Sequence, residues 1–129
     1  MTIAEAMREL EAWKPHKAEP EQICKWLEEL DRRVLLEVMR FRHTTLGAIK
    51  YGYPECVDYE LLLEAPHDSV YGYWLAFKID MMNGETDKAI NSGDLYNEHW
   101  NSFVAWFMNM YHPGAGYSWF EPRRNFGRS

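Results

Sequence analysis

The chain has 129 residues, which is the length of one domain and leaves no room for two separate cores. Hydrophobic residues make up 47% of it and aromatic residues 16%, so the composition excludes a chain that is disordered throughout. The net charge of −6 is spread unevenly, because residues 112–129 carry three Arg and one Glu, whereas residues 1–111 carry 11 basic and 19 acidic side chains. Such an acidic body disfavours nucleic-acid binding, which depends on neutralising phosphates with Lys and Arg.

Nothing in the sequence indicates a membrane or secreted protein. No apolar run approaches the roughly 20 residues that a membrane helix needs, and residues 1–5 lack the basic flank and apolar segment of a secretory signal. Cys24 and Cys56 are far apart in the sequence, and one disulfide between them is possible. Isolated thiols without a signal peptide are more typical of a reducing compartment, so we expect a cytosolic protein in which Cys24 is a buried, inert thiol.

The first helix is expected over residues 2–13. Thr2 and Glu5 have the spacing of a capping box, and Pro15 ends the run. The apolar stripe at helical spacing consists of Ile3, Met7, Leu10 and Trp13.

A second, longer helix should begin near Glu19, because Pro20 suits the first turn of a helix. About 22 residues of helix would be roughly 33 Å long. Its stripe consists of Ile23, Trp26, Leu27, Leu30, Val34, Val38 and Phe41. Its solvent-facing side is predicted to consist of Glu28, Glu29, Asp31, Arg32 and Arg33.

The helical pattern is interrupted over residues 42–66, where Gly, Pro and Thr residues are typical of turns. Residues 59–63 fit a short extended segment and a single helical turn equally well. Long ordered connections are unusual in compact bundles and tend to carry function, so we expect a contact surface here.

A third helix is expected from about residue 68, capped by Asp68 or Ser69 and stopped by Asn83–Gly84. Its stripe consists of Val70, Tyr71, Trp74, Phe77 and Met81. The fourth helix should span residues 86–111, with Gly93 allowing a neighbour to approach closely. Its inner face consists of Ile90, Tyr96, Asn97, Trp100, Phe103, Val104 and Phe107. We therefore predict an all-α bundle of about four helices over residues 1–112, with an irregular 42–66 connection and an irregular tail over residues 113–129.

The motifs of common enzyme classes are absent, including a GxSxG elbow, a phosphate loop and GxGxxG. Ser92 falls in the middle of a predicted helix, which favours a packing or solvent position over a nucleophile. Glu64 and His67 have the Glu-x-x-His spacing of a dimetal bundle, but the motif occurs once and a proline interrupts it. The carboxylates within residues 55–64 suit a solvated loop better than an acid–base pair. We therefore expect no enzyme activity, no cofactor and no metal.

The aromatic residues divide into two groups. Five tryptophans at helical spacing are expected in the core, namely Trp13, Trp26, Trp74, Trp100 and Trp106. Trp119 lies beyond the last helix, in a tail that could dock on its own domain, stay disordered or bind a partner. Aromatic residues with Arg are enriched at interface hot spots, so we favour partner binding. The candidate partner-binding residues are Tyr117, Trp119, Phe120, Arg123, Arg124 and Phe126.

Several stretches of the chain resemble a family of small prophage proteins from Gram-positive bacteria. The opening MTIAEA and the segment KWLEELD at residues 25–31 are similar to the family's first part. The stretches ELLL and APHD within residues 60–68, and YWL and DMMNGE within residues 73–85, are similar to its second part. The resemblance covers roughly residues 1–112, most specifically 60–112, where Asn97, Phe103, Trp106, Asn109 and His112–Pro113 resemble its last helix.

The resemblance implies a head–tail connector (adaptor) protein, a small α-helical subunit that forms a ring beneath the portal. It implies contacts with other copies and with portal or tail components, location in the bacterial cytoplasm and then the virion, and no catalytic residues. A basic tail on an acidic body suits the unlike surfaces of a ring interface.

Three other hypotheses stay open. A phage-encoded regulatory protein-binding module without catalytic activity is the main alternative. DNA binding through Arg32, Arg33, Arg40 and Arg42 is disfavoured by the acidic body, and a small enzyme by the missing motifs.

Overall fold

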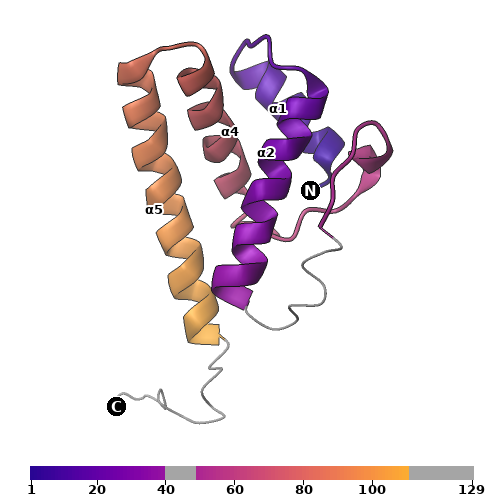
Figure 1. Ribbon diagram of the computed structural model, residues 1–129. Coiled ribbons are helices and arrows are strands. Elements are labelled where there is room, and N and C mark those ends of the chain that lie inside the picture. Colours follow the sequence, from indigo (N-terminus) through magenta and orange to yellow (C-terminus); the bar gives the residue numbers. More distant parts are fainter. Residues whose placement is uncertain (40–48, 111–129) are drawn as a thin grey trace. The chain divides into compact units, whose positions relative to one another are not determined.

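A computed structural model describes residues 1–39 and 49–110, and within these ranges the protein is all-α (Figure 1). The α-helices are α1 (Ile3–Trp13), α2 (Pro20–Arg33), α4 (Ser69–Met82) and α5 (Thr86–Met110). A π-helical stretch, η1 (Val34–Met39), continues α2, and a 3-10 turn, η2 (Glu55–Asp58), lies before α4. The described ranges contain no β-strand, only an isolated antiparallel bridge between Thr2 and Glu60. The predicted all-α architecture is confirmed.

The chain forms two compact units, Met1–His99 and Trp100–Ser129. The first contains α1, α2, η1, η2, α4 and the first turns of α5. Of the second, the structure describes residues 100–110, where the Phe103 ring lies 5.9 Å from that of Trp100 and 6.1 Å from that of Phe107, centroid to centroid. The predicted boundary between residues 112 and 113 lies outside the described residues.

The ends of the helices follow local sequence signals. The Glu5 N–H donates to Thr2 Oγ1 at 3.1 Å and the Thr2 N–H donates to Glu5 Oε1 at 2.8 Å, so the predicted capping box is present. Asp68 occupies the cap position of α4, although its side chain accepts no capping hydrogen bond. Gly84 ends α4 with a φ of 71°, a backbone conformation that favours glycine, as predicted from Asn83–Gly84.

The core of the first unit lies between α2 and its two neighbours, α1 and α4. In Figure 1, α2 lies in front of α4, and α4 forms a hairpin with the start of α5. The indole N–H of Trp74 donates to the Trp26 carbonyl at 2.7 Å, which joins α4 to α2. The predicted stripes supply most of the buried apolar residues, among them Ile3, Leu10, Ile23, Leu27, Leu30, Val34, Val38, Val70 and Tyr71.

Five residues predicted to face the core, namely Trp13, Met81, Ile90, Asn97 and Trp106, are exposed instead, and those predictions are wrong. Trp13 is 52% exposed, because it lies in the last turn of α1, where its ring meets the Tyr73 ring edge-on. Met81 is 58% and Ile90 59% exposed. Apolar residues occur on every side of α4, so its sequence does not define one inner face, and Ile79 and Asp80 are buried in place of Met81. Trp106 is also exposed.

Gly93 allows the close approach of α4 that the sequence predicts. A Cβ atom at this position would lie 3.2 Å from Cδ1 and 3.3 Å from Cε1 of the Phe77 ring. Gly72, the fourth residue of α4, is less crowded, because the nearest neighbour of an added Cβ would be Trp13 Cζ3 at 3.7 Å. The first turns of α5 therefore pack on α4 at a distance that only glycine permits without a shift of the ring.

The two glycines provide a matched pair of substitutions. Gly72→Ala should raise the free energy of unfolding by about 0.5–1 kcal/mol, because alanine is the better helix former and the added methyl group would meet Trp13 at an ordinary van der Waals distance. The free energy of unfolding of the Gly93→Ala variant should be lower than that of the Gly72→Ala variant by about 1 kcal/mol or more, because the Phe77 ring must move. Urea denaturation of both variants measures the difference, and equal gains in stability would contradict the close packing.

Candidate protein-contact surface

The connection that follows residue 48 is attached to the helices through a fully buried carboxylate, that of Asp31 in α2. The Tyr51 hydroxyl donates to Asp31 Oδ2 at 2.5 Å, and the Leu62 N–H donates to the same oxygen at 3.2 Å. The Tyr71 hydroxyl, from α4, donates to Oδ1 at 2.6 Å and accepts the Leu63 N–H at 2.8 Å. One side chain of α2 thus binds both the connection and α4.

The prediction that Asp31 lies on the solvent-facing side of α2 is wrong. Asp31 lies four residues after Leu27, on the buried side of the helix. There, three hydrogen-bond donors replace the water molecules that an exposed carboxylate would bind. Burial raises the pKa of Asp31, although the hydrogen bonds from Tyr51 and Tyr71 oppose this effect. Burial and the nearby carboxylate raise the pKa of both tyrosines, so their hydroxyls stay protonated and serve as donors.

Two further residues of α2 bind the start of the connection. Glu28 accepts the Tyr51 N–H at 2.8 Å through Oε1, and the Arg32 Nε–H donates to the Ile49 carbonyl at 3.1 Å. Arg32 also lies 3.4 Å from Glu28 and forms an ion pair with it. The backbone at residues 49–51 is therefore fixed along the side of α2.

The middle of the connection is extended beside the N-terminus. The Ile3 N–H donates to the Tyr59 carbonyl at 3.0 Å, and the Leu61 N–H donates to the Met1 carbonyl at 3.0 Å. Of the two possibilities left open for residues 59–63, the helical turn is therefore wrong and the extended segment is correct. This pairing joins residues nearly 60 positions apart in the sequence, which no local pattern could indicate.

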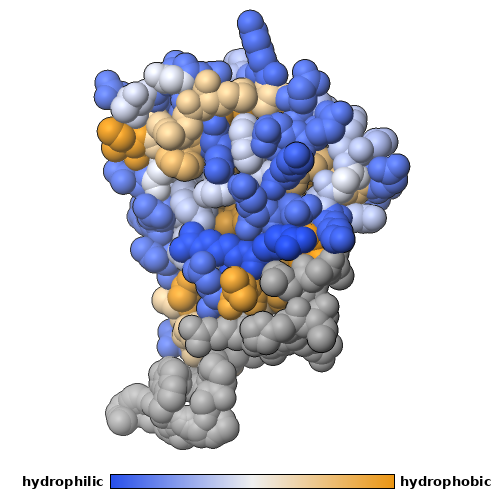
Figure 2. All heavy atoms as spheres, in the orientation of Figure 1, coloured by the Kyte–Doolittle hydropathy of each residue, from blue (hydrophilic) through white to orange (hydrophobic). Residues whose placement is uncertain are grey.

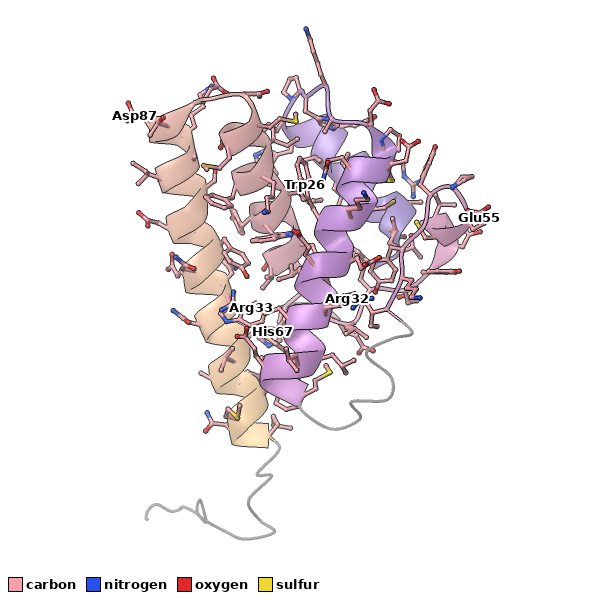
Figure 3. The ribbon with its side chains drawn as sticks, in the orientation of Figure 1. Trp26, Arg32, Arg33, Glu55, His67 and Asp87 are labelled. Carbon is pink, nitrogen blue, oxygen red and sulfur yellow. The ribbon has the colours of Figure 1, made fainter. Side chains whose placement is uncertain are left out.

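The connection carries several exposed acidic and aromatic side chains, which we together name the acidic face. It consists of Tyr53, Glu55, Asp58, Tyr59, Glu60 and Glu64. Glu55 points away from the helices at the outer edge of η2 (Figure 3). Glu60 lies 3.5 Å from the N-terminal amine and is itself exposed. The four carboxylates, Glu55, Asp58, Glu60 and Glu64, are exposed to solvent, as predicted.

The arginines of α2 do not form a free basic surface. Figure 3 shows Arg32 on the side of α2 that faces the connection and Arg33 on the side that faces α5. Arg33 donates to the Tyr96 hydroxyl at 2.7 Å and to Glu37 at 3.1 Å. Hydrophilic residues cover much of the face seen in Figure 2, including the part over α2. Arg40 and Arg42, the other two residues of the DNA-binding hypothesis, lie outside the described residues.

A second buried carboxylate, Asp80 in α4, explains the position of Ser92. Lys14 Nζ lies 2.9 Å from Asp80 Oδ1, and the Ser92 hydroxyl donates to Oδ2 at 2.6 Å. Ser92 is buried in α5, as a packing position requires, and its hydroxyl joins α5 to α4. The sequence pattern did not indicate the burial of Asp80.

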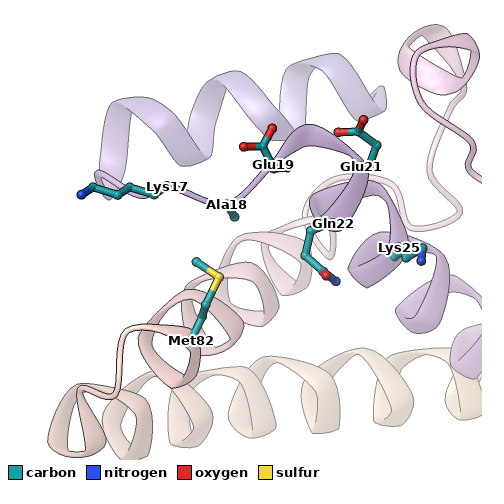
Figure 4. Close-up of a pocket in the computed structure, with 7 residues that line it drawn as sticks. All are labelled: Lys17, Ala18, Glu19, Glu21, Gln22, Lys25 and Met82. Carbon is teal, nitrogen blue, oxygen red and sulfur yellow. The ribbon is translucent and has the colours of Figure 1, made fainter.

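A shallow hollow of about 480 Å³ lies between the start of α2 and the end of α4 (Figure 4). Its lining residues are Lys17, Ala18, Glu19, Glu21, Gln22, Lys25 and Met82. Two cations and two carboxylates give it no preference for one sign of charge, and none of these side chains is buried. Across residues 1–39 and 49–110, no group of three or more His, Cys, Asp or Glu side chains could hold a metal ion.

The six candidate partner-binding residues, Tyr117, Trp119, Phe120, Arg123, Arg124 and Phe126, lie outside the described residues. The acidic face is the part of the predicted 42–66 contact region that the structure does describe.

Removing the central carboxylate tests what holds the acidic face in place. Asp31→Ala should lower the free energy of unfolding by about 3 kcal/mol, because three buried donors lose their acceptor. Glu29→Ala, on the exposed side of the same helix, removes one ion pair with Lys78 and should lower the free energy of unfolding by less than about 1 kcal/mol. Chemical denaturation of both variants provides the comparison, and similar losses would contradict the role of Asp31.

The pH dependence of stability gives a second test. Because the folded pKa of Asp31 is raised above its unfolded value, its contribution to stability is present at low pH and is lost as the pH rises through the folded pKa. The free energy of unfolding of the wild type, relative to Asp31→Asn, should therefore fall as the pH rises above about 4. Denaturation curves over a pH series measure this, with Glu29→Gln as the control. A relative stability that rises over the same range would contradict the direction of the shift.

No family model, curated protein or solved structure matches the chain. Within the part of the chain that the structure describes, no helix combines the length and the apolar character needed to cross a membrane.

Proposed function

We propose that the protein is a phage or prophage virion assembly protein of the head–tail connector type, which acts by contact with other proteins. Two observations support the proposal. The sequence resembles a prophage family to which that role is ascribed, and the chain presents an outward acidic face fixed from beneath by Asp31. The acidic face is the observation from the structure that carries the proposal.

The composition of the acidic face suits recognition of a basic, aromatic segment. Tyr53 and Tyr59 are exposed among carboxylates, although tyrosine is a residue that buries well against a partner. Carboxylates bind guanidinium groups through charge-assisted hydrogen bonds, and tyrosine rings accept the same groups on their faces. A partner segment with arginines between aromatic residues would satisfy both kinds of group.

Residues 113–129 have this composition, with Arg123, Arg124 and Arg128 among four aromatic residues. We infer that this tail of one copy binds the acidic face of the next copy. Two unlike surfaces on one chain give a head-to-tail interface, which closes into a ring when the rotation between copies allows it. The portal and tail components of the virion would then bind to the assembled ring.

A charge exchange tests the pairing of the tail with the acidic face. Arg123→Glu with Arg124→Glu should weaken self-association at least about tenfold, because like charges would then meet. Glu55→Lys with Asp58→Lys should do the same, and the four substitutions together should restore association. Sedimentation velocity over a concentration series, at low and at physiological salt, measures each effect.

The control and the contradicting outcomes are well defined. Glu9→Lys with Glu11→Lys makes the same change of charge on exposed residues of α1 and should leave association unchanged. A wild type that is monomeric at every concentration would contradict self-assembly. A wild-type chain that instead binds a regulatory protein one to one would favour the alternative, a protein-binding module.

A further inference from the structure

The two cysteines, distant in the sequence, meet beneath the acidic face. Cys24 lies in α2 and Cys56 in η2, and their Sγ atoms are 3.2 Å apart. Both side chains are fully buried as free thiols. The contact joins η2 to α2 at a separation of 32 residues in the sequence.

We propose that Cys24 and Cys56 are a redox modification site, at which a low-molecular-weight disulfide such as oxidised glutathione converts the two thiols into one intrachain disulfide. The site does not depend on the proposed function. It differs from the sequence-based expectation of an inert Cys24, because the sequence does not show that the second thiol lies within reach.

The geometry allows the bond with a small displacement. A disulfide has an S–S distance of about 2.05 Å, so the two sulfur atoms must approach by roughly 1 Å. The short turn η2 can move more readily than α2, because its own backbone hydrogen bonds are local. The Cys56 N–H donates to the Gly52 carbonyl at 3.1 Å, and the Tyr59 N–H donates to the Cys56 carbonyl at 2.9 Å. The turn can therefore shift toward α2 as one piece.

The chemistry is a pair of thiol–disulfide exchanges. One protein thiol loses its proton to solvent, and its thiolate attacks a sulfur of oxidised glutathione, which breaks the glutathione disulfide and releases one glutathione thiolate. The thiolate of the second cysteine then attacks the protein sulfur of the mixed disulfide and releases the other glutathione thiolate. The protein gains one S–S bond and loses two thiol hydrogens, and two electrons reduce one oxidised glutathione to two reduced molecules.

Burial controls the rate of this reaction. Burial and the hydrogen bond with Cys56 raise the pKa of Cys24 to about 12, so the closed pair holds little thiolate at neutral pH. The oxidant reaches the pair when η2 separates from α2, a local opening that costs less than global unfolding. Tyr51 fastens the connection to Asp31 only five residues before Cys56. In the Tyr51→Phe variant, the disulfide between Cys24 and Cys56 should therefore form several-fold faster than in the wild type.

The test uses the full chain in a glutathione buffer, followed by alkylation and intact mass measurement. In excess oxidised glutathione the mass should fall by that of two hydrogen atoms, with no added glutathione. Trypsin should then release a linked pair of peptides, residues 18–25 and residues 51–78, which separate on reduction. The oxidised chain should melt about 10 °C higher, because the bond closes a long loop in the unfolded state.

The variants Cys24→Ser and Cys56→Ser provide the controls. Each should keep its helical circular dichroism, form no intrachain disulfide and show no difference in melting temperature between oxidising and reducing buffer. A wild type that stays fully reduced in the oxidising buffer would overturn the proposal. So would persistent glutathione adducts or linked dimers on a non-reducing gel, because both show that the two thiols of one chain do not react with each other.

Discussion

The described structure of the first unit depends on the buried carboxylate of Asp31. Removing a carboxylate from water costs several kcal/mol unless hydrogen bonds replace the lost solvent. Here two tyrosine hydroxyls and one backbone N–H do so, and each comes from a different part of the chain: the start of the connection, its end, and α4. The same bonds satisfy donors that would otherwise be buried without partners. The carboxylate therefore fixes the position of the connection on the core, although the connection itself has little regular structure.

The helix α4 is held by polar contacts near both of its ends. Near its start, Tyr71 binds Asp31 of α2, and near its end, Asp80 binds Lys14 after α1 and Ser92 of α5. Apolar packing alone would allow α4 to rotate, because apolar residues occur on every side of it. Directional hydrogen bonds at two points remove that freedom. A helix with an ambiguous apolar pattern thus acquires one orientation from two buried carboxylates.

The features that the sequence predicted correctly depend on neighbouring residues, and those it missed depend on residues far apart. The capping box of Thr2 and Glu5 and the stop at Gly84 need only local signals. The burial of Asp31 depends on partners 20, 31 and 40 residues away, so its charge wrongly indicated solvent exposure. The extended segment beside Met1 and the contact of the two thiols likewise require the folded chain. The acidic face could be predicted as a solvated loop, but its rigid attachment could not.

The connection carries its two kinds of side chain on opposite sides, and this arrangement couples the two proposals. Tyr51 and Cys56 face the helices, whereas Glu55 and Asp58, on either side of Cys56, face solvent. A segment that binds the acidic face more tightly when η2 lies on α2 would lower the population of the open state through which the thiols react. By thermodynamic linkage, a disulfide that holds η2 on α2 would favour the same bound segment to the same degree. Oxidation would then act on assembly by fixing the surface in its binding conformation, with no change in the residues that the partner contacts.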